Sequence, residues 1–171
     1  MHAEEIISLA KKTIEEYVIN KKIIDIPEDL SSDLVNRRAG VFVTLKKNGK
    51  LRGCIGTIEA IEENIAREII RNGISAANYD PRFPGVKADE LDKLEYSVDI
   101  LGKKEKIDSK KELDPNKYGV IVEQQNKRGL LLPNLEGVNT VDEQINIARQ
   151  KAAIAEGADY NLYRFKVERY K

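Results

Sequence analysis

The stretch Val41 to Thr57, VFVTLKKNGKLRGCIGT, decides the local fold of this chain of 171 residues. Asn48-Gly49 within it is a strong signal for a two-residue hairpin turn. The apolar residues from Val41 to Leu45 predict a strand before the turn, and the segment from Lys50 to Thr57 predicts its partner. The stretch therefore predicts an antiparallel β-hairpin.

The second strand of this hairpin offers one thiol and one fixed positive charge. Cys54 is the only cysteine, Arg52 lies two residues before it, and Gly53 and Gly56 add little bulk. Alternate side chains of a strand share a face, so Arg52 and Cys54 are expected to point the same way. Cys54 is either a small buried core residue or a catalytic thiol made acidic by the nearby cation. The glycines indicate either a bulge with tight packing or a ligand-binding backbone.

Composition excludes several classes of protein. The 29 basic and 29 acidic residues cancel, whereas nucleic-acid binding usually needs a basic surplus on one face. No apolar run approaches the roughly 18 residues that a membrane helix needs. The Glu and Lys residues near the N-terminus do not fit a secretory signal. A single cysteine cannot form an internal disulfide, which favours a cytoplasmic location.

The histidine count excludes further chemistry. The only histidine is His2, which is expected to lie at a frayed end. Without another histidine there is no Cys-His pair, no Ser-His-Asp triad and no Cys/His zinc site. Only a metal site made of carboxylates stays open, and no calcium-loop spacing appears, so we predict no metal.

The remaining periodicities predict an α+β fold with a mainly antiparallel sheet and three longer helices. Helices are expected over residues 3–20 and 61–78, and a third begins after Thr140, which forms a capping box with Glu143. The expected buried residues of this third helix are Val141, Ile145, Ala148, Ala152 and Ala155. Further strands are expected over 96–100, 120–123, 129–132 and 163–167, and residues 21–38 are expected to be irregular. The sequence contains no internal repeat and no linker. We therefore predict a single domain over 1–171, which could be divided into two lobes.

Three arginines lie in segments bounded by glycine or proline: Arg52, Arg82 and Arg128. Each alone is a typical surface charge. Together they would form a socket for a carboxylate or phosphate, because guanidinium binds such groups with two parallel hydrogen bonds. This requires the three segments to converge. Asp80, in the stiff segment Asp80 to Gly85, is first a turn former before proline and otherwise a ligand-binding residue.

Gln144 and Lys151 lie seven residues apart on the last predicted helix, so they are expected to share a face. A solvated polar face is the first interpretation, and ligand binding is the second. The sequence contains neither of the common glycine-rich loops that hold phosphates.

Taken together, these segments resemble the AMMECR1 domain family. The motifs that carry the resemblance are Leu51-Arg52-Gly53-Cys54-Ile55-Gly56-Thr57, Ile74-Ser75-Ala76-Ala77 with Asp80-Pro81-Arg82-Phe83, Lys117-Tyr118-Gly119-Val120, Arg128-Gly129-Leu130-Leu131-Leu132-Pro133, Val141-Asp142-Glu143-Gln144 and Gln150-Lys151-Ala152. The resemblance covers nearly the whole chain, from about Ala3 to Tyr170. It implies a two-lobed domain in which the strand with Arg52 and Cys54 lies near a cleft between the lobes.

Prokaryotic proteins of this type are called AmmeMemoRadiSam system protein A, which implies a system shared with a Memo-like protein and a radical SAM protein. The resemblance brings no established reaction and no cofactor. The chain departs from the usual pattern at Arg149, where relatives often carry a second cysteine, and at Ala153, where glycine is common. Three hypotheses follow: an accessory protein that binds a small anion, an enzyme with Cys54 as nucleophile, and a protein-interaction module without a ligand.

Overall fold

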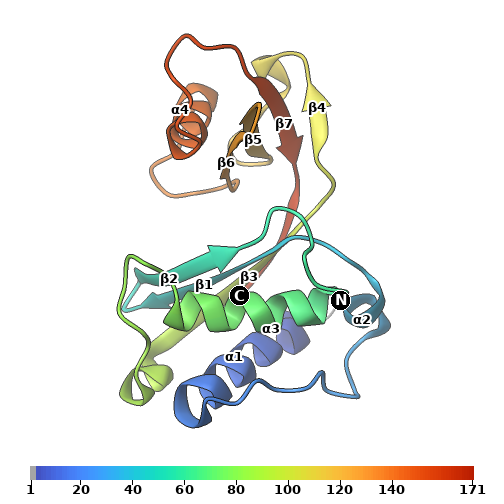
Figure 1. Cartoon of the computed structure of the whole chain (residues 1–171), viewed down its shortest axis with the longest axis vertical. Coiled ribbons are helices and arrows are strands. Elements are labelled where there is room, and N and C mark those ends of the chain that lie inside the picture. The colour runs from blue at the N-terminus through green and yellow to red at the C-terminus, as the bar shows by residue number, and fades with distance from the viewer. Residues whose placement is uncertain (1–2) are drawn as a thin grey trace. The chain divides into compact units, whose positions relative to one another are not determined.

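The computed structural model describes residues 3–171, which form two compact units (Figure 1). The first unit holds the described residues up to Ile100 together with residues 168–171, and the second holds residues 101–167. His2 lies outside the described residues. Each unit combines one antiparallel sheet with helices, so the predicted α+β fold class is confirmed.

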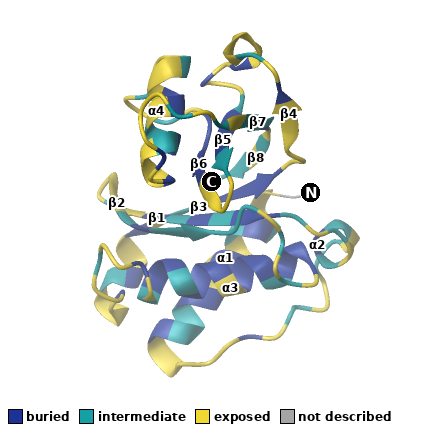
Figure 2. Cartoon of the chain, turned by 45° about the horizontal axis from the view of Figure 1, so that its top comes forward, coloured by how far each residue is buried: buried dark blue, intermediate teal, exposed yellow. Residues whose placement is uncertain are grey.

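The first unit is a four-stranded sheet covered by helices on one face. Its strands follow the order β2-β1-β3-β8. The elements are α1 (Ala3–Asn20), α2 (Ser32–Asn36), β1 (Val41–Lys47), β2 (Lys50–Gly56), α3 (Ile65–Asn78), the 3₁₀ helix η1 (Ala88–Lys93), β3 (Leu94–Leu101) and β8 (Val167–Tyr170). Helix α3 packs on β1 and β2, and α1 packs on α3. Helix α3 is therefore buried along most of its length (Figure 2).

The core of the first unit follows from the alternation along β1. Val41, Val43 and Leu45 are fully buried, whereas Phe42 and Thr44 on the opposite face are half-buried. Branched and aliphatic side chains at every second position are what a sheet packed on helices on one face requires. Ile6 and Ile14 of α1 complete the same apolar cluster.

The second unit is a smaller sheet covered by one helix, with strands in the order β4-β7-β5-β6. Its elements are β4 (Glu105–Ile107), the 3₁₀ helix η2 (Lys110–Glu112), β5 (Gly119–Gln124), β6 (Lys127–Leu131), α4 (Val141–Lys151) and β7 (Asn161–Phe165). Helix α4 packs on β5 and β6. Thr140 caps α4 by accepting a hydrogen bond from the backbone N–H of Glu143, so the predicted capping box is confirmed.

The two units repeat one topology without repeating a sequence. In the first, β1, β2, α3 and β3 come in this order along the chain, with η1 between α3 and β3, and the strands lie in the order β2-β1-β3. In the second, β5, β6, α4 and β7 follow one another and lie in the equivalent order β6-β5-β7. All four of these strand pairs are antiparallel. Each unit thus contains the same ββαβ arrangement.

Several predicted boundaries are wrong for identifiable reasons. Helix α3 begins at Ile65 rather than at residue 61, because the side chain of Asn64 caps it. Helix α4 ends at Lys151, so Ala155 is exposed rather than buried in it. The last predicted strand is two strands, β7 and β8, with Lys166 between them. The short elements α2 and β4 lie in polar segments that gave no signal.

Candidate functional site

Arg52 lies at a β-bulge. Leu45 pairs with Gly53 and Lys46 pairs with Leu51, so Arg52 has no partner residue on β1. A bulge inserts one extra residue and breaks the alternation of side chains along the strand. Whether Arg52 and Cys54 point the same way stays a prediction, because the bulge lies between their two positions in the ladder.

The guanidinium of Arg52 is bound to other groups of the protein. It donates from Nε and Nη2 to the two carboxylate oxygens of Glu90, at 3.1 and 2.9 Å, and to the carbonyl oxygens of Pro84 and Gly85, at 2.9 and 3.3 Å. Lys47 Nζ lies 2.8 Å from the same carboxylate. These contacts, that of Arg52 above all, hold the pKa of Glu90 well below its usual range. Arg52 thus fastens the loop before η1 to the β2 strand.

Gly53 and Gly56 allow close packing on opposite sides of β2. A Cβ on Gly53 would collide with the carbonyl oxygen of Ala76 in α3, so only glycine lets this helix approach the strand so closely. A Cβ on Gly56 would collide with the ring of Phe42, which lies over it from the neighbouring strand. The packing interpretation of both glycines therefore has direct structural support.

Asp80 and Arg82 cover the free edge of β2 at Cys54. The backbone N–H of Cys54 donates to Asp80 Oδ2 at 2.9 Å, and its carbonyl oxygen accepts from Arg82 Nη2 at 3.2 Å. Strand β2 is the outermost strand of its sheet. The two side chains thus replace the donor and acceptor that a further strand would supply.

Asp80 also fixes the orientation of Arg82. Its carboxylate accepts from Arg82 Nε at 3.0 Å, from Nη2 at 2.8 Å and from the backbone N–H of Arg82 at 3.0 Å. Asp80 is 3% exposed, and its bonds to Arg82 hold its pKa well below the usual range. The side chain of Arg82 is 55% exposed, so a buried carboxylate holds a guanidinium that reaches solvent.

Cys54 is half-buried and forms no disulfide. Its Sγ lies 3.2 Å from the hydroxyl of Thr44, directly opposite on β1. Burial raises the pKa of the thiol, while the Thr44 hydroxyl and the charge of Arg82 act in the other direction. The cation that lowers the thiol pKa is Arg82 rather than Arg52, and burial outweighs it.

The structure brings Cys54, Asp80 and Arg82 into contact at the free edge of β2, and Arg52 bonds to Pro84 and Gly85 in the loop that carries Arg82. The other predicted site residues, Arg128, Gln144 and Lys151, belong to the second unit. Nη1 of Arg128 lies 3.8 Å from Glu123 on the paired strand β5. The three-arginine socket stays a prediction, since it joins residues of both units.

Gln144 and Lys151 do not form a solvated face. Gln144 is fully buried, and its Nε2 donates to the carbonyl oxygen of Tyr118 at 2.8 Å. Its Oε1 has no hydrogen-bond partner among the described residues. Lys151 is exposed and donates to the carbonyl oxygen of Leu130 at 3.2 Å. Gln144 begins the buried side of α4, which the polar character of the residue concealed.

Lys151 repeats in the second unit the role that Arg82 has in the first. Leu130 follows Gly129 as Cys54 follows Gly53, and both carbonyl oxygens accept from a cation at or beyond the end of the packed helix. A Cβ on Gly129 would collide with the carbonyl oxygen of Ala148, as one on Gly53 would with Ala76. Several motif residues thus serve the repeated packing of hairpin and helix.

Comparison with known proteins places the chain in a family. A family model described as AMMECR1 matches residues 7–171. The chain belongs to the AMMECR1 family. A Thermotoga maritima protein is 53% identical over 164 residues, which are 95% of this chain and 94% of that protein. The crystal structure of an uncharacterised protein from Pyrococcus horikoshii, 32% identical, covers 98% of this chain and 89% of its own with a TM-score of 0.90.

One relative of this AMMECR1 chain is much longer. A Clostridium acetobutylicum protein is 49% identical over 166 residues, which are 96% of this chain but 35% of that protein. The chain thus spans about a third of the length of this relative. Most of that protein lies outside the matched stretch.

Two buried polar residues of α3, Glu68 and Asn72, are not among the predicted site residues. Glu68, fully buried, accepts from the Thr57 hydroxyl at 2.6 Å and from two backbone N–H groups, those of residues 61 and 62, at 3.0 and 2.8 Å. Asn72 donates to Thr57 Oγ1 at 3.1 Å and to the carbonyl oxygen of Val41 at 2.9 Å. This network fixes the chain where it leaves β2. The available signal was that residues 68 and 72 share the helix face of Ile65 and Ile69.

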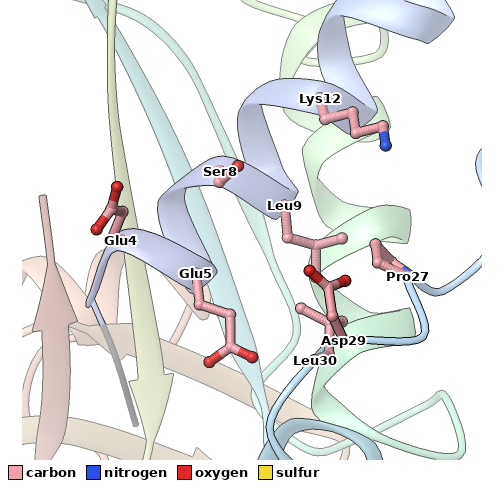
Figure 3. A pocket seen from close by; sticks show the side chains of 8 residues that line it. All are labelled: Glu4, Glu5, Ser8, Leu9, Lys12, Pro27, Asp29 and Leu30. Carbon is pink, nitrogen blue, oxygen red and sulfur yellow. The ribbon is translucent and has the colours of Figure 1, made fainter.

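The first unit also has a hollow away from these residues. It has a volume of about 360 Å³ and is lined by Glu4, Glu5, Ser8, Leu9, Lys12, Pro27, Asp29 and Leu30. Figure 3 shows that Glu4 and Glu5 point to different sides of α1 and that Lys12 points away from both. These polar side chains do not converge on one point, and none belongs to the predicted site.

Residues 3–171 contain neither a metal-binding cluster nor a membrane-spanning helix. No group of three or more histidine, cysteine, aspartate and glutamate side chains there has a metal-binding arrangement. None of the helices in this part of the chain has the length and apolar character to cross a membrane.

Proposed function

We propose that the chain binds a small anionic ligand, a carboxylate or phosphate, at the exposed end of Arg82 beside Cys54. The observation that carries this proposal is the pattern of hydrogen bonds made by the Arg82 guanidinium. Its Nε and Nη2 are held by Asp80 and by the carbonyl oxygen of Cys54, whereas Nη1 makes no hydrogen bond to a described residue. The guanidinium is therefore oriented before a ligand arrives.

Orientation in advance favours binding because less side-chain freedom is lost when the ligand is held. The fork of Arg82 is occupied by Asp80, so Nη1 offers a single-sided contact rather than a bidentate one. The carboxylate of Asp80 also offsets much of the positive charge. These features favour a weakly bound metabolite or intermediate over a tightly held cofactor.

The test is titration of the folded protein with inorganic phosphate and with malonate, followed by NMR of the backbone amides. Saturable shifts at Cys54 and Arg82 are expected, and Arg82→Ala should abolish them. Arg71 is a matched control, since it is an exposed arginine of α3 paired with a single glutamate. Shifts that persist in Arg82→Ala, or that vanish equally in Arg71→Ala, would reject this site.

We further propose that the chain acts as an accessory protein in the cytoplasm, together with a Memo-like protein and a radical SAM protein. The family resemblance supports these partners, and the longer Clostridium acetobutylicum relative supports association with another protein segment. The free thiol of Cys54 fits a reducing compartment. Co-expression of the three proteins followed by affinity purification tests this; recovery of the tagged chain without either partner would count against it.

The alternative of an enzyme with Cys54 as nucleophile has less support. The raised thiol pKa leaves little thiolate at neutral pH. The test compares the turnover of wild type and Cys54→Ser in an assay reconstituted with the Memo-like and radical SAM proteins. Undiminished turnover in that variant would leave the accessory role as the better description.

A further inference from the structure

The sequence contains two Asn-Gly dipeptides, and the structure gives them opposite surroundings. Asn48-Gly49 is the exposed tip of the β1–β2 hairpin, with φ of 53° and 72°. A Cβ on Gly49 would meet no atom within 4 Å. Asn72-Gly73 lies inside α3, where Asn72 is 2% exposed and its side-chain amide donates two hydrogen bonds.

We propose that Asn48 is a site of spontaneous deamidation, whereas Asn72 is protected by the fold. The backbone nitrogen of Gly49 loses its proton and attacks Cγ of Asn48. A new C–N bond closes a five-membered succinimide, the C–N bond of the side-chain amide breaks, and ammonia leaves. Water then opens the ring at either carbonyl, giving aspartate or isoaspartate, so water is the only co-reactant.

The surroundings of Gly49 leave its nitrogen accessible to this reaction. Glycine has no side chain to shield the attacking atom. The N–H of Gly49 donates only to Glu95 Oε1, and at 3.3 Å this contact is longer than an ordinary hydrogen bond. The turn must open briefly to bring nitrogen and Cγ together, and exposed tips open at little free-energy cost.

Asn72 has neither an exposed side chain nor an accessible backbone nitrogen in the glycine that follows it. Its amide is held by the carbonyl oxygen of Val41 and by the hydroxyl of Thr57, and Gly73 packs against Ile14 of α1. Ring closure there requires the helix to open within the core, which has a free-energy cost close to that of unfolding the unit.

Deamidation at the tip would change the turn between β1 and β2. The new carboxylate would lie near Glu95, and isoaspartate would add a methylene to a two-residue turn whose length sets the register of Lys47 with Lys50.

The test is incubation of the folded protein at mildly alkaline pH, followed by mass spectrometry of its peptides. The Asn48 peptide should gain the mass difference between an amide and a carboxyl group and separate into two isomers. Conversion at Asn72 should be at least about tenfold slower in the folded protein, because protection by structure slows reactions that need opening. In denaturant both sites should react, and Asn48→Gln should remove the signal at the tip.

Two results would overturn the proposal. One is a folded protein whose Asn48 stays intact over a period in which the denatured protein converts at both sites. The other is equal conversion at Asn48 and Asn72 in the folded protein, which would deny the fold any role.

Discussion

The guanidinium of Arg169 donates from Nε to Oδ1 of Asp99 at 2.6 Å, although seventy positions separate the two residues. Arg169 lies on β8, which flanks β3 at the edge of the first sheet. The side chain of Asp99 is almost wholly buried, and burial raises its pKa while Arg169 acts to lower it. The pair joins β8 to β3 within the first unit.

Replacing Arg169 with methionine should lower the free energy of unfolding by about 3 kcal/mol, because a buried carboxylate would lose its partner. The pKa of Asp99 is raised in the folded state, so Asp99 makes its full favourable contribution to the free energy of unfolding at low pH. This contribution is lost as the pH rises through the folded-state pKa. The loss in Arg169→Met should therefore be larger at pH 8 than at pH 5 in urea unfolding. Arg71→Met is the control, since exposed pairs contribute little. An equal loss in both variants would contradict the prediction.

Asp80→Asn should destabilise the protein by about 2 kcal/mol, since hydrogen bonds to a charged group are the stronger kind. The pKa of Asp80 is lowered in the folded state. Its contribution is thus present above the unfolded-state pKa of about 4 and disappears as the pH falls further. The free energies of unfolding of wild type and variant should differ by a constant amount from pH 5 to 8 and should become equal in acid. A gap that stays open in strong acid would mean that the carboxylate charge is not responsible.

Gly53→Ala should cost about 2–3 kcal/mol, because the added methyl group meets the carbonyl oxygen of Ala76 and must push α3 away. Gly85→Ala is a matched control, as its nearest atom, Asn78 Oδ1, lies at an ordinary 3.6 Å. Thermal unfolding of the two variants makes the comparison. Similar melting temperatures would show that the strand and helix are less closely packed than described.

Glu68→Gln tests the network beyond β2. The glutamine can present only one acceptor oxygen, and its amide would face the backbone N–H groups of residues 61 and 62 or the Thr57 hydroxyl. A loss of about 2 kcal/mol is expected, with faster amide hydrogen exchange over residues 57–64. Exchange that rises uniformly over the first unit would instead indicate a general loss of stability.

The fold was predictable wherever one residue sets a local geometry. Asn48-Gly49 specifies the hairpin, Thr140 with Glu143 specifies the start of α4, and the alternation along β1 specifies its buried face. A local side-chain cap and the pairing between strands account for the elements that differ. Asn64 delays the start of α3, and short strands such as β4 depend on their partner for stability rather than on their own sequence.

The candidate site was only partly predictable because its partners come from distant segments. Arg82 bonds to the carbonyl oxygen of Cys54, and Arg52 bonds to that of Gly85 in the loop that carries Arg82. The bulge at Arg52 and the acceptor Glu90 were not visible, since a strand pattern does not show which residue lacks a partner. Gln144 is fully buried, although a polar side chain is typical of a surface position.

The pKa of the Cys54 thiol is the most direct measure of the surroundings of the candidate site. The Thr44 hydroxyl, 3.2 Å from Sγ, lowers the thiol pKa against the effect of burial. Thr44→Val keeps the shape of the side chain and removes the hydroxyl, so the pH midpoint of alkylation by iodoacetamide should move upward. Ser97→Ala is the control, because Ser97 pairs with Thr44 from the other side and has no bond to the thiol. A midpoint that stays fixed or falls in Thr44→Val would show that the hydroxyl does not stabilise the thiolate, whereas a rise confined to that variant identifies Thr44 as the residue that tunes Cys54.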